Sequence, residues 1–229
     1  MYKSVISGDI ISSTSLLVKD RELLEQSLTA LLEELKNKFD VFGRVIKGDY
    51  LEVVVPKPQN ALRVALAIKS FVKSVSITNA SKYKKSSRVQ LFKTYGIRLA
   101  IGYAELTRFN PTKGIIDGEA IYLSGRLING LSSFGKDRVV IKNTLYFISN
   151  NESLNESFES LFALIDTLIN KATPRQSEVL YLKLLFNNET TIAAKLNIGQ
   201  SVVNQHSTSL GWNSIEKAVN YFNKTISNS

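Results

Sequence analysis

The order of apolar patterns along residues 1–103 restricts the fold of this 229-residue chain more than any other feature. β-rich runs alternate there with stretches whose apolar residues recur at the 3.6-residue spacing of a helix. The Gly48-Asp49 pair between two such runs is typical of a tight hairpin turn, so these two strands are predicted to be antiparallel. In chain order, we predict a strand at 5–6, a helix at 20–39, strands at 41–46 and 51–55, a helix at 59–72 and a strand at 95–103.

This order, β-α-β-β-α-β, is typical of the ferredoxin-like fold, in which helices cover one face of an antiparallel sheet. A further helix at 119–129 and a strand at 138–141 are predicted to complete the same domain. The predicted fold class is therefore α+β for this part of the chain.

The distribution of charge divides the chain into three parts. Residues 1–150 contain 23 basic and 13 acidic side chains, residues 151–170 contain 0 and 4, and residues 171–229 contain 6 and 3. Apolar residues recur at helical spacing in the acidic part, which we interpret as a connector helix between an α+β domain and an all-α domain. The basic segment 78–88 is predicted to be an exposed insertion.

Composition excludes several kinds of site. The chain has no cysteine, which excludes disulfides and thiolate metal sites, and its single histidine leaves carboxylates as the only numerous metal ligands. A bound metal is therefore expected to be a hard cation, Mg²⁺ or Mn²⁺. No apolar run approaches the roughly 20 residues of a membrane-spanning helix, and the N-terminus lacks the pattern of a secretory signal. We expect a cytoplasmic protein without a membrane partner.

Two carboxylates are predicted to converge at one edge of the sheet. Asp9 ends the first strand, and Asp49 lies in the hairpin between the next two strands. Paired carboxylates at strand ends can bind a divalent cation that holds a triphosphate, because hard cations bridge carboxylate and phosphate oxygens. From the residues alone, a turn or capping role for both side chains remains an alternative.

Four segments, 8–14, 46–49, 96–105 and 117–127, carry motifs that recur together in one family. They resemble, in that order, the Asp-Ile-x-Gly-Ser-Thr opening, the metal-binding hairpin, the Arg-x-Gly-Ile-x-x-Gly strand and the Gly-x-x-Val-Asn-x-Ala-x-Arg helix of class III nucleotide cyclases. The resemblance covers residues 1–145. The pair of Gly-Asp motifs also resembles the SatD family, a bacterial relative of the cyclase fold.

The resemblance implies that Asp9, Asp49 and the backbone carbonyl of Ile10 hold a metal. It also implies that Arg126 stabilises negative charge in the transition state, a task that suits a guanidinium group. The resemblance therefore implies a nucleoside triphosphate as ligand, with Mg²⁺ or Mn²⁺.

This chain departs from the family pattern at three positions. Tyr122 stands in place of the catalytic Asn, Val45 in place of the base-selecting Lys, and Ser12 in place of a phosphate-loop Gly. We predict that Tyr122 packs in the core. Metal and nucleotide binding are predicted with catalysis degenerate, and an active nucleotide cyclase is the alternative.

Residues 172–211 show a second pattern, of two short helices joined by a tight turn. Thr173-Pro174 is typical of a helix start, Ala193 allows close helix approach, and Asn197 tolerates the left-handed backbone of a turn. The stretch resembles the helix-turn-helix of sigma-70 region 4 and of LuxR-type regulators, which runs from Thr-Pro-Arg-Gln through Ile-Ala-x-x-Leu to Val-x-x-His.

The second resemblance implies that the second short helix lies in the major groove of DNA. The side chains predicted to reach base edges or phosphates are Gln200, Ser201, Asn204, Gln205 and Ser207. Arg175 and Lys195 are predicted to contact the DNA backbone. The sequence therefore predicts a homodimeric transcription regulator with a nucleotide-sensing domain. The remaining alternative is a protein-interaction module in which neither site is active.

Overall fold

The computed structural model describes residues 2–78, 86–132 and 143–229 of the chain. The first part contains β1 (Tyr2–Ile10), α1 (Val18–Phe39), β2 (Phe42–Ile46), β3 (Tyr50–Val55), α2 (Ala61–Ser74), α4 (Ser87–Tyr95), β4 (Ile97–Asn110), β5 (Ile115–Gly118), α5 (Glu119–Ser132) and β6 (Leu145–Ser149). The helices that follow are α6 (Glu152–Lys171), α7 (Pro174–Leu184), α8 (Glu189–Leu196), α9 (Gln200–Leu210) and α10 (Trp212–Ser227). Short 3-10 turns occupy Ser13–Ser15 and Pro58–Asn60. The α+β class predicted for the first part is confirmed.

The strands pair in the order β2-β3-β1-β4-β5, and β6 also pairs with β4. β1 is antiparallel to both of its neighbours, β3 and β4, whereas β6 runs parallel to β4. The long strand β4 pairs with β1 along one side, and along the other side its first half pairs with β6 and its second half with β5. Asp9, near the end of β1, therefore lies on a strand with neighbours on both sides.

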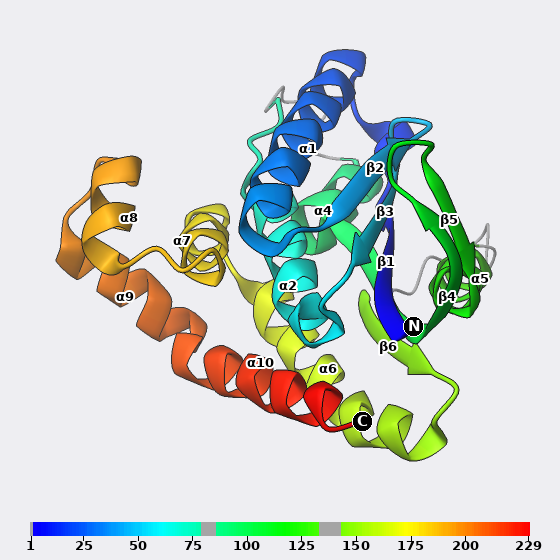
Figure 1. Ribbon diagram of the computed structural model, residues 1–229. Helices are drawn as coiled ribbons and strands as arrows, with labels where there is room; N and C mark the ends of the chain where they lie inside the picture. The colour runs from blue at the N-terminus through cyan, green and yellow to red at the C-terminus, as the bar shows by residue number, and fades with distance from the viewer. Residues whose placement is uncertain (1, 79–85, 133–142) are drawn as a thin grey trace.

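The two faces of the sheet are covered by different helices, with α1 and α2 on one side and α5 on the other (Figure 1). Side chains alternate along β1, so Ile6 joins the large core with α1 and α2, whereas Val5 joins a smaller core with Ala120 of α5. Gly102 on β4 permits the approach of α5, since a Cβ there would lie 2.2 Å from the carbonyl oxygen of Ala120.

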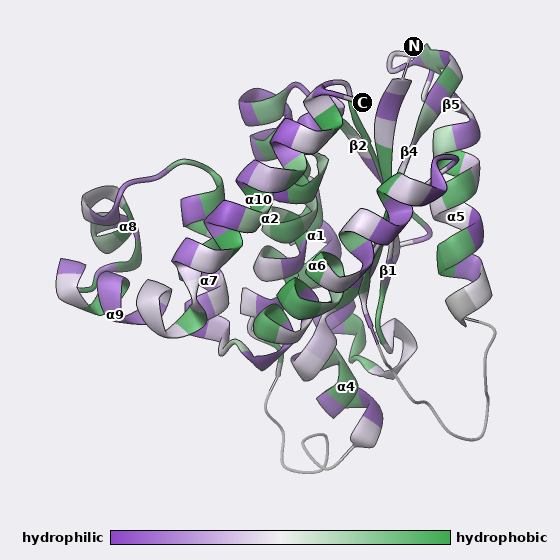
Figure 2. Cartoon of the chain, turned by 90° about the horizontal axis from the view of Figure 1, so that it is seen from below, coloured by the Kyte–Doolittle hydropathy of each residue, from purple (hydrophilic) through white to green (hydrophobic). Residues whose placement is uncertain are grey.

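The large core continues into the C-terminal helices. Tyr181 of α7 packs edge-on against Phe71 of α2, with 5.0 Å between ring centroids, and its hydroxyl donates to Glu34 of α1. Seen from below, α10 lies beside α2 and α6, while α8 and α9 stand away from the sheet (Figure 2). One apolar core therefore contains residues from both sides of the domain boundaries predicted at residues 150 and 170.

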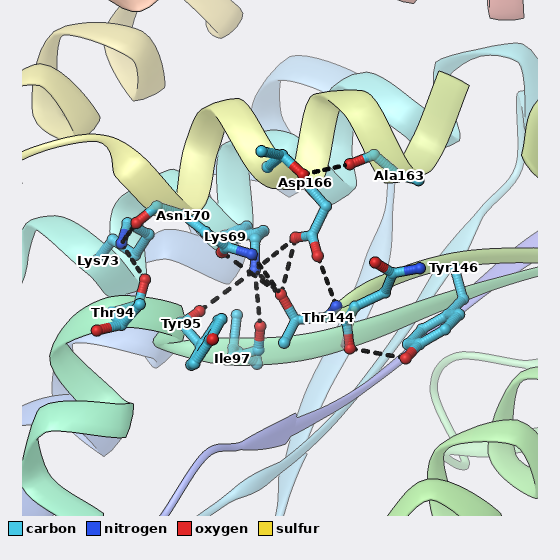
Figure 3. Close-up of polar contacts among 12 residues, drawn as sticks. Lys69, Lys73, Thr94, Tyr95, Ile97, Thr144, Tyr146, Ala163, Asp166 and Asn170 are labelled. Atoms are coloured by element: carbon cyan, nitrogen blue, oxygen red, sulfur yellow. Dashed lines mark hydrogen bonds and ion pairs between the residues drawn. The ribbon is translucent and has the colours of Figure 1, made fainter. Parts of the chain in front are cut away.

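A buried polar cluster also attaches α6 to the first part of the chain (Figure 3). The ammonium of Lys69 on α2 is fully buried and lies 3.2 Å from Asp166 of α6. It also donates to the hydroxyl of Thr144 at 2.6 Å and to the carbonyls of Tyr95 and Ile97 at 3.2 Å. Burial lowers the pKa of Lys69, and the Asp166 carboxylate opposes this shift. The cluster joins α2, β4, α6 and the start of β6.

The predicted elements of residues 1–103 are present with shifted ends, and one helix was missed. α1 begins before Asp20, which is buried and accepts hydrogen bonds from the backbone and hydroxyl of Thr78. The missed helix, α4, begins inside the segment 78–88. Ser87 and Arg88 are exposed, as predicted, and the buried residues of α4, Val89 and Phe92, lie beyond that segment. Residues 79–85 and the predicted strand at 138–141 lie outside the described residues. Within the described ranges, no helix is long and apolar enough to cross a membrane.

Candidate functional site

β1 and the β2–β3 hairpin bring Asp9 and Asp49 to the same edge of the sheet. Asp9 pairs in register with Tyr50, the residue after Asp49, and the N–H of Ile10 donates to the carbonyl of Asp49 at 3.0 Å. Burial raises the pKa of Asp9 to about 6; Arg98 lowers it and Asp49 raises it further. The two carboxylates are therefore close enough to interact electrostatically, as the sequence predicts.

Local backbone chemistry places the Asp49 carboxylate. Lys47 and Gly48 both have positive φ, 54° and 80°, so the chain reverses tightly just before Asp49. The hydroxyl of Ser13 donates to Asp49 Oδ2 at 2.7 Å. Ser12, with φ 57°, adopts the left-handed conformation that glycine adopts without strain. The turn after β1 therefore retains a glycine-like backbone although its residue is serine.

The oxygen atoms at the edge of the sheet that carries Asp9 and Asp49 are of the kind that bind hard cations such as Mg²⁺. Mg²⁺ typically takes one or two protein carboxylates together with water and substrate phosphates. Asp9, Asp49 and the Ile10 carbonyl match that ligand set in kind. In the part of the chain that the structure describes, no group of three or more His, Cys, Asp or Glu side chains could hold a metal. Two carboxylates and one backbone carbonyl would leave a bound cation dependent on further ligands from outside the chain.

Two cavities meet at Asp49. The first, of about 410 Å³, lies between the turn after β1, the start of α1 and the hairpin, and Arg21 and Lys47 line it with Asp49. The second, of about 650 Å³, lies between the hairpin and α5, and Tyr122 and Arg126 line it with Asp49. The structure therefore brings Arg126 and Asp49 to one cavity.

Tyr122 does not pack in the core, contrary to the sequence prediction. Its side chain is 45% exposed and its hydroxyl donates to Asp117, which raises the pKa of Tyr122. The guanidinium of Arg126 lies 5.6 Å from the centroid of the Tyr122 ring. Tyr122 therefore supports Arg126 at the rim of the second cavity.

Arg44 and Glu52 also line the second cavity, although the sequence motifs predict no role for either. They are opposite one another on β2 and β3 and form an ion pair at 2.6 Å, and Arg44 also donates to the carbonyl of Gly114 between β4 and β5. Val45 packs against the large core instead, whereas Arg44 and Ile46, on the other face of β2, line the cavity. The cross-strand charge pair was the signal that could have identified Arg44 and Glu52.

The short helices predicted within residues 172–211 are present as α7, α8 and α9, together with the residues that cap them. Thr173 and Gln176 form a reciprocal capping box at the start of α7, and the Asn188 side chain caps α8. Asn197 has φ 51° and ψ 50°, the left-handed conformation that the sequence predicts for the turn between α8 and α9. Ile192 of α8 is fully buried in the same core as α9.

The residues predicted to contact DNA lie on exposed surface, with one exception. The exposed ones are Lys195 on α8, Arg175 on α7, and Gln200, Ser201, Asn204 and Gln205 on α9. The guanidinium of Arg175 lies 2.7 Å from Glu178. Ser207 is only 4% exposed, and its hydroxyl donates to the carbonyl of Asn204. Contrary to the sequence prediction, Ser207 packs inward and does not belong to the outer face of α9.

Comparisons with known proteins give limited similarity. A scan against models of protein families found no match, and neither did a search of curated proteins. Among solved structures, one of a bacterial light-regulated adenylyl cyclase is 16% identical with a TM-score of 0.41, over 64% of this chain and 74% of that one. A second such structure is 14% identical with a TM-score of 0.41, over 64% of this chain and 43% of that one.

Proposed function

We propose that this protein is a DNA-binding transcription regulator whose first domain is cyclase-like and binds a metal–nucleoside triphosphate without turnover. The observation that carries the proposal is the outer face of α9, where Gln200, Ser201, Asn204 and Gln205 are all exposed. α8 and α9 stand away from the sheet, where a DNA duplex has access to them (Figure 1). The strand order β2-β3-β1-β4 supports a ferredoxin-like first domain.

The side chains on α9 suit the reading of bases. Gln200 and Asn204 are four residues apart, as are Ser201 and Gln205, so both pairs follow one face of the helix. Amide side chains can bind adenine through two hydrogen bonds in the major groove. Lys195 and Arg175 would add phosphate contacts without base preference. A homodimer is part of this proposal, because helix-turn-helix units bind paired half-sites.

Replacing Asn204 and Gln205 together with alanine is expected to relax the base preference of the protein. Each lost two-bond contact removes about 1–3 kcal/mol of discrimination between bases. The measurement is selection of binding sites from randomised DNA at fixed salt. Asn220→Ala on the exposed face of α10 is the matched control and should leave the selected sites unchanged. An unchanged profile in the double variant would remove both residues from the DNA interface.

The metal–nucleotide half of the proposal rests on the edge that carries Asp9 and Asp49. A bound metal would neutralise phosphate charge there. Ser13 holds the Asp49 carboxylate in place, and Arg126 supplies a fixed positive charge in the adjoining cavity. Because Tyr122 occupies the position of the family's catalytic Asn, we propose binding rather than catalysis.

Asp49→Asn is expected to abolish the Mn²⁺-dependent rise in Tm that a nucleoside triphosphate produces in the wild type. The substitution removes the charge while the amide oxygen can still accept from Ser13. A ligand at 100 times its Kd stabilises a protein by about 2.7 kcal/mol, which a thermal melt detects readily. Asp40→Asn, at the exposed left-handed C-cap of α1, is the matched control. Equal shifts in wild type and Asp49→Asn would contradict the metal role.

An active nucleotide cyclase is the second candidate, because Arg126 and Asp49 share one cavity. Chromatography of the purified protein with each nucleoside triphosphate and Mn²⁺ distinguishes the two. A cyclic product that is lost in Asp9→Asn would establish catalysis. Metal-dependent binding without product supports the sensing role.

A further inference from the structure

One side of α6 carries a row of leucines at the surface of the protein. Leu164 is 67% exposed and Leu168 is 38% exposed, whereas Leu161 is partly buried against the core. The three residues are separated by three and four positions, so they follow one face of the helix. Single exposed leucines are common, but a contiguous row along one helix face indicates a surface that another surface covers.

The polar side chains beside these leucines need little water. Ser157, Ser160 and Thr167 are exposed on the same side of α6, and none of them is charged. The hydroxyl of Ser157 donates to the carbonyl of Leu154, and that of Thr167 donates to the carbonyl of Ala163. Because these hydrogen bonds lie within α6 and persist without water, covering this surface has a small desolvation cost. We call residues 157, 160, 161, 164, 167 and 168 the leucine face of α6.

Opposite charges flank the two ends of the leucine face. Glu156 lies eight residues before Leu164, and Lys171 lies seven residues after it. Both are exposed, and among the described residues neither forms an ion pair. At about 1.5 Å per residue, Glu156 is about 12 Å before Leu164 and Lys171 is about 10.5 Å after it. The two charges are therefore almost symmetric about Leu164.

A face with this symmetry is complementary to an inverted copy of itself. In a two-fold dimer, each contact between residues i and j occurs twice, once in each direction. When two α6 helices pack antiparallel about Leu164, Leu168 of one copy lies level with Ser160 of the other, whose small side chain leaves room for it. Lys171 of one copy then lies level with Glu156 of the other, and the two helix dipoles are opposed.

We propose that the leucine face of α6 is the surface through which two copies of this chain form a two-fold dimer. The occupant is a second copy because the face matches its own inverted copy both in side-chain size and in charge. The inference rests on the proposed function only for the existence of a homodimer. The leucines at the centre supply affinity, and the two Glu156–Lys171 pairs at the rim set the antiparallel orientation.

The test is sedimentation equilibrium of the full chain at low salt over a range of protein concentrations. Leu164→Glu places two like charges at the two-fold axis and should weaken the dimer at least about tenfold. Because Leu164 is 67% exposed, the variant should keep the circular dichroism spectrum of the wild type. The matched control is Leu23→Glu on α1, where the leucine is 43% exposed, and it should dimerise like wild type.

Charge reversal tests the antiparallel arrangement. Glu156→Lys alone and Lys171→Glu alone each place like charges side by side, and each should weaken the dimer about three- to tenfold at low salt. The double variant Glu156→Lys/Lys171→Glu restores opposite charges across the interface and should dimerise like wild type. Both positions are exposed, so these variants decide the question if Leu164→Glu does not fold. Losses that add in the double variant overturn the inference.

The remaining outcomes separate this inference from the proposed function. A wild-type chain that stays monomeric at its highest soluble concentration overturns the inference and removes the homodimer from the proposed function. A dimer that Leu164→Glu leaves intact overturns the inference alone, because the copies then pair through another surface. A dimer that Leu164→Glu disrupts, in a protein that binds neither DNA nor nucleotide, supports the inference and contradicts the proposed function.

Discussion

Lys69→Met is expected to lower the free energy of unfolding by about 3–5 kcal/mol, because it leaves the buried carboxylate of Asp166 without its cation. Asp166 is only 1% exposed, so water cannot replace the lost ammonium. The hydroxyl of Thr144 and the carbonyls of Tyr95 and Ile97 lose a donor in the same step. Urea denaturation followed by circular dichroism measures the difference.

A second substitution tests whether the uncompensated charge causes this loss. In Lys69→Met/Asp166→Asn the amide oxygen can still accept from the backbone N–H of Thr144, but it carries no charge. We expect the double variant to be more stable than Lys69→Met alone, since neighbouring substitutions that share one interaction are not additive. Lys36→Met on the exposed side of α1 is the control and should change stability by less than about 0.5 kcal/mol. A similarly small loss in Lys69→Met would refute the role assigned to this ion pair.

Phe222→Ala is expected to lower the free energy of unfolding by about 3–5 kcal/mol, the usual cost of removing a buried aromatic ring. Phe222 on α10 is fully buried. Its ring centroid lies 4.8 Å from that of Phe158, 5.7 Å from that of Phe147 and 6.0 Å from that of Phe162. The substitution leaves a cavity between α10, α6 and β6, which rigid helices cannot close completely.

The neighbouring residue gives the control for this prediction. Tyr221 is 50% exposed and meets the aromatic cluster only at its edge, with 6.1 Å between its ring centroid and that of Phe158, so Tyr221→Ala should cost less than about 1 kcal/mol in the same urea titration. Because α10 follows α9 directly, we also expect Phe222→Ala to weaken DNA binding at temperatures near its lowered Tm. Equal losses in the two variants would show that the aromatic cluster does not anchor α10.

Local chemistry made many elements of this chain predictable from sequence. The Gly48-Asp49 turn follows from backbone conformations that glycine adopts without strain. The start of α7 at Thr173-Pro174 and the turn at Asn197 depend on side chains only a few residues away. The convergence of Asp9 and Asp49 was also predictable, because strand order places the end of β1 beside the β2–β3 hairpin.

Burial of particular side chains was not predictable, since it depends on contacts between distant segments. The sequence of α9 does not specify which of its faces the rest of the protein covers. In the structure, Ser207 is buried on the same helix as the core residues Val203 and Leu210. A tyrosine ring such as that of Tyr122 is often buried in a core. Here the close contact between Gly102 and Ala120 places a different face of α5 against the sheet, so Tyr122 stays exposed.

The sequence by itself determined the order β1-α1-β2-β3-α2-β4, the hairpin turn and the caps of the C-terminal helices, because each depends on residues close together in the chain. Tertiary structure decided the pairing of Lys69 with Asp166, the position of Arg98 beside Asp9 and the packing of α7 on α2. Each of these contacts joins segments that are far apart in the sequence. The periodicity of apolar residues shows which face of a helix or strand is buried, but it does not show which distant segment packs against that face.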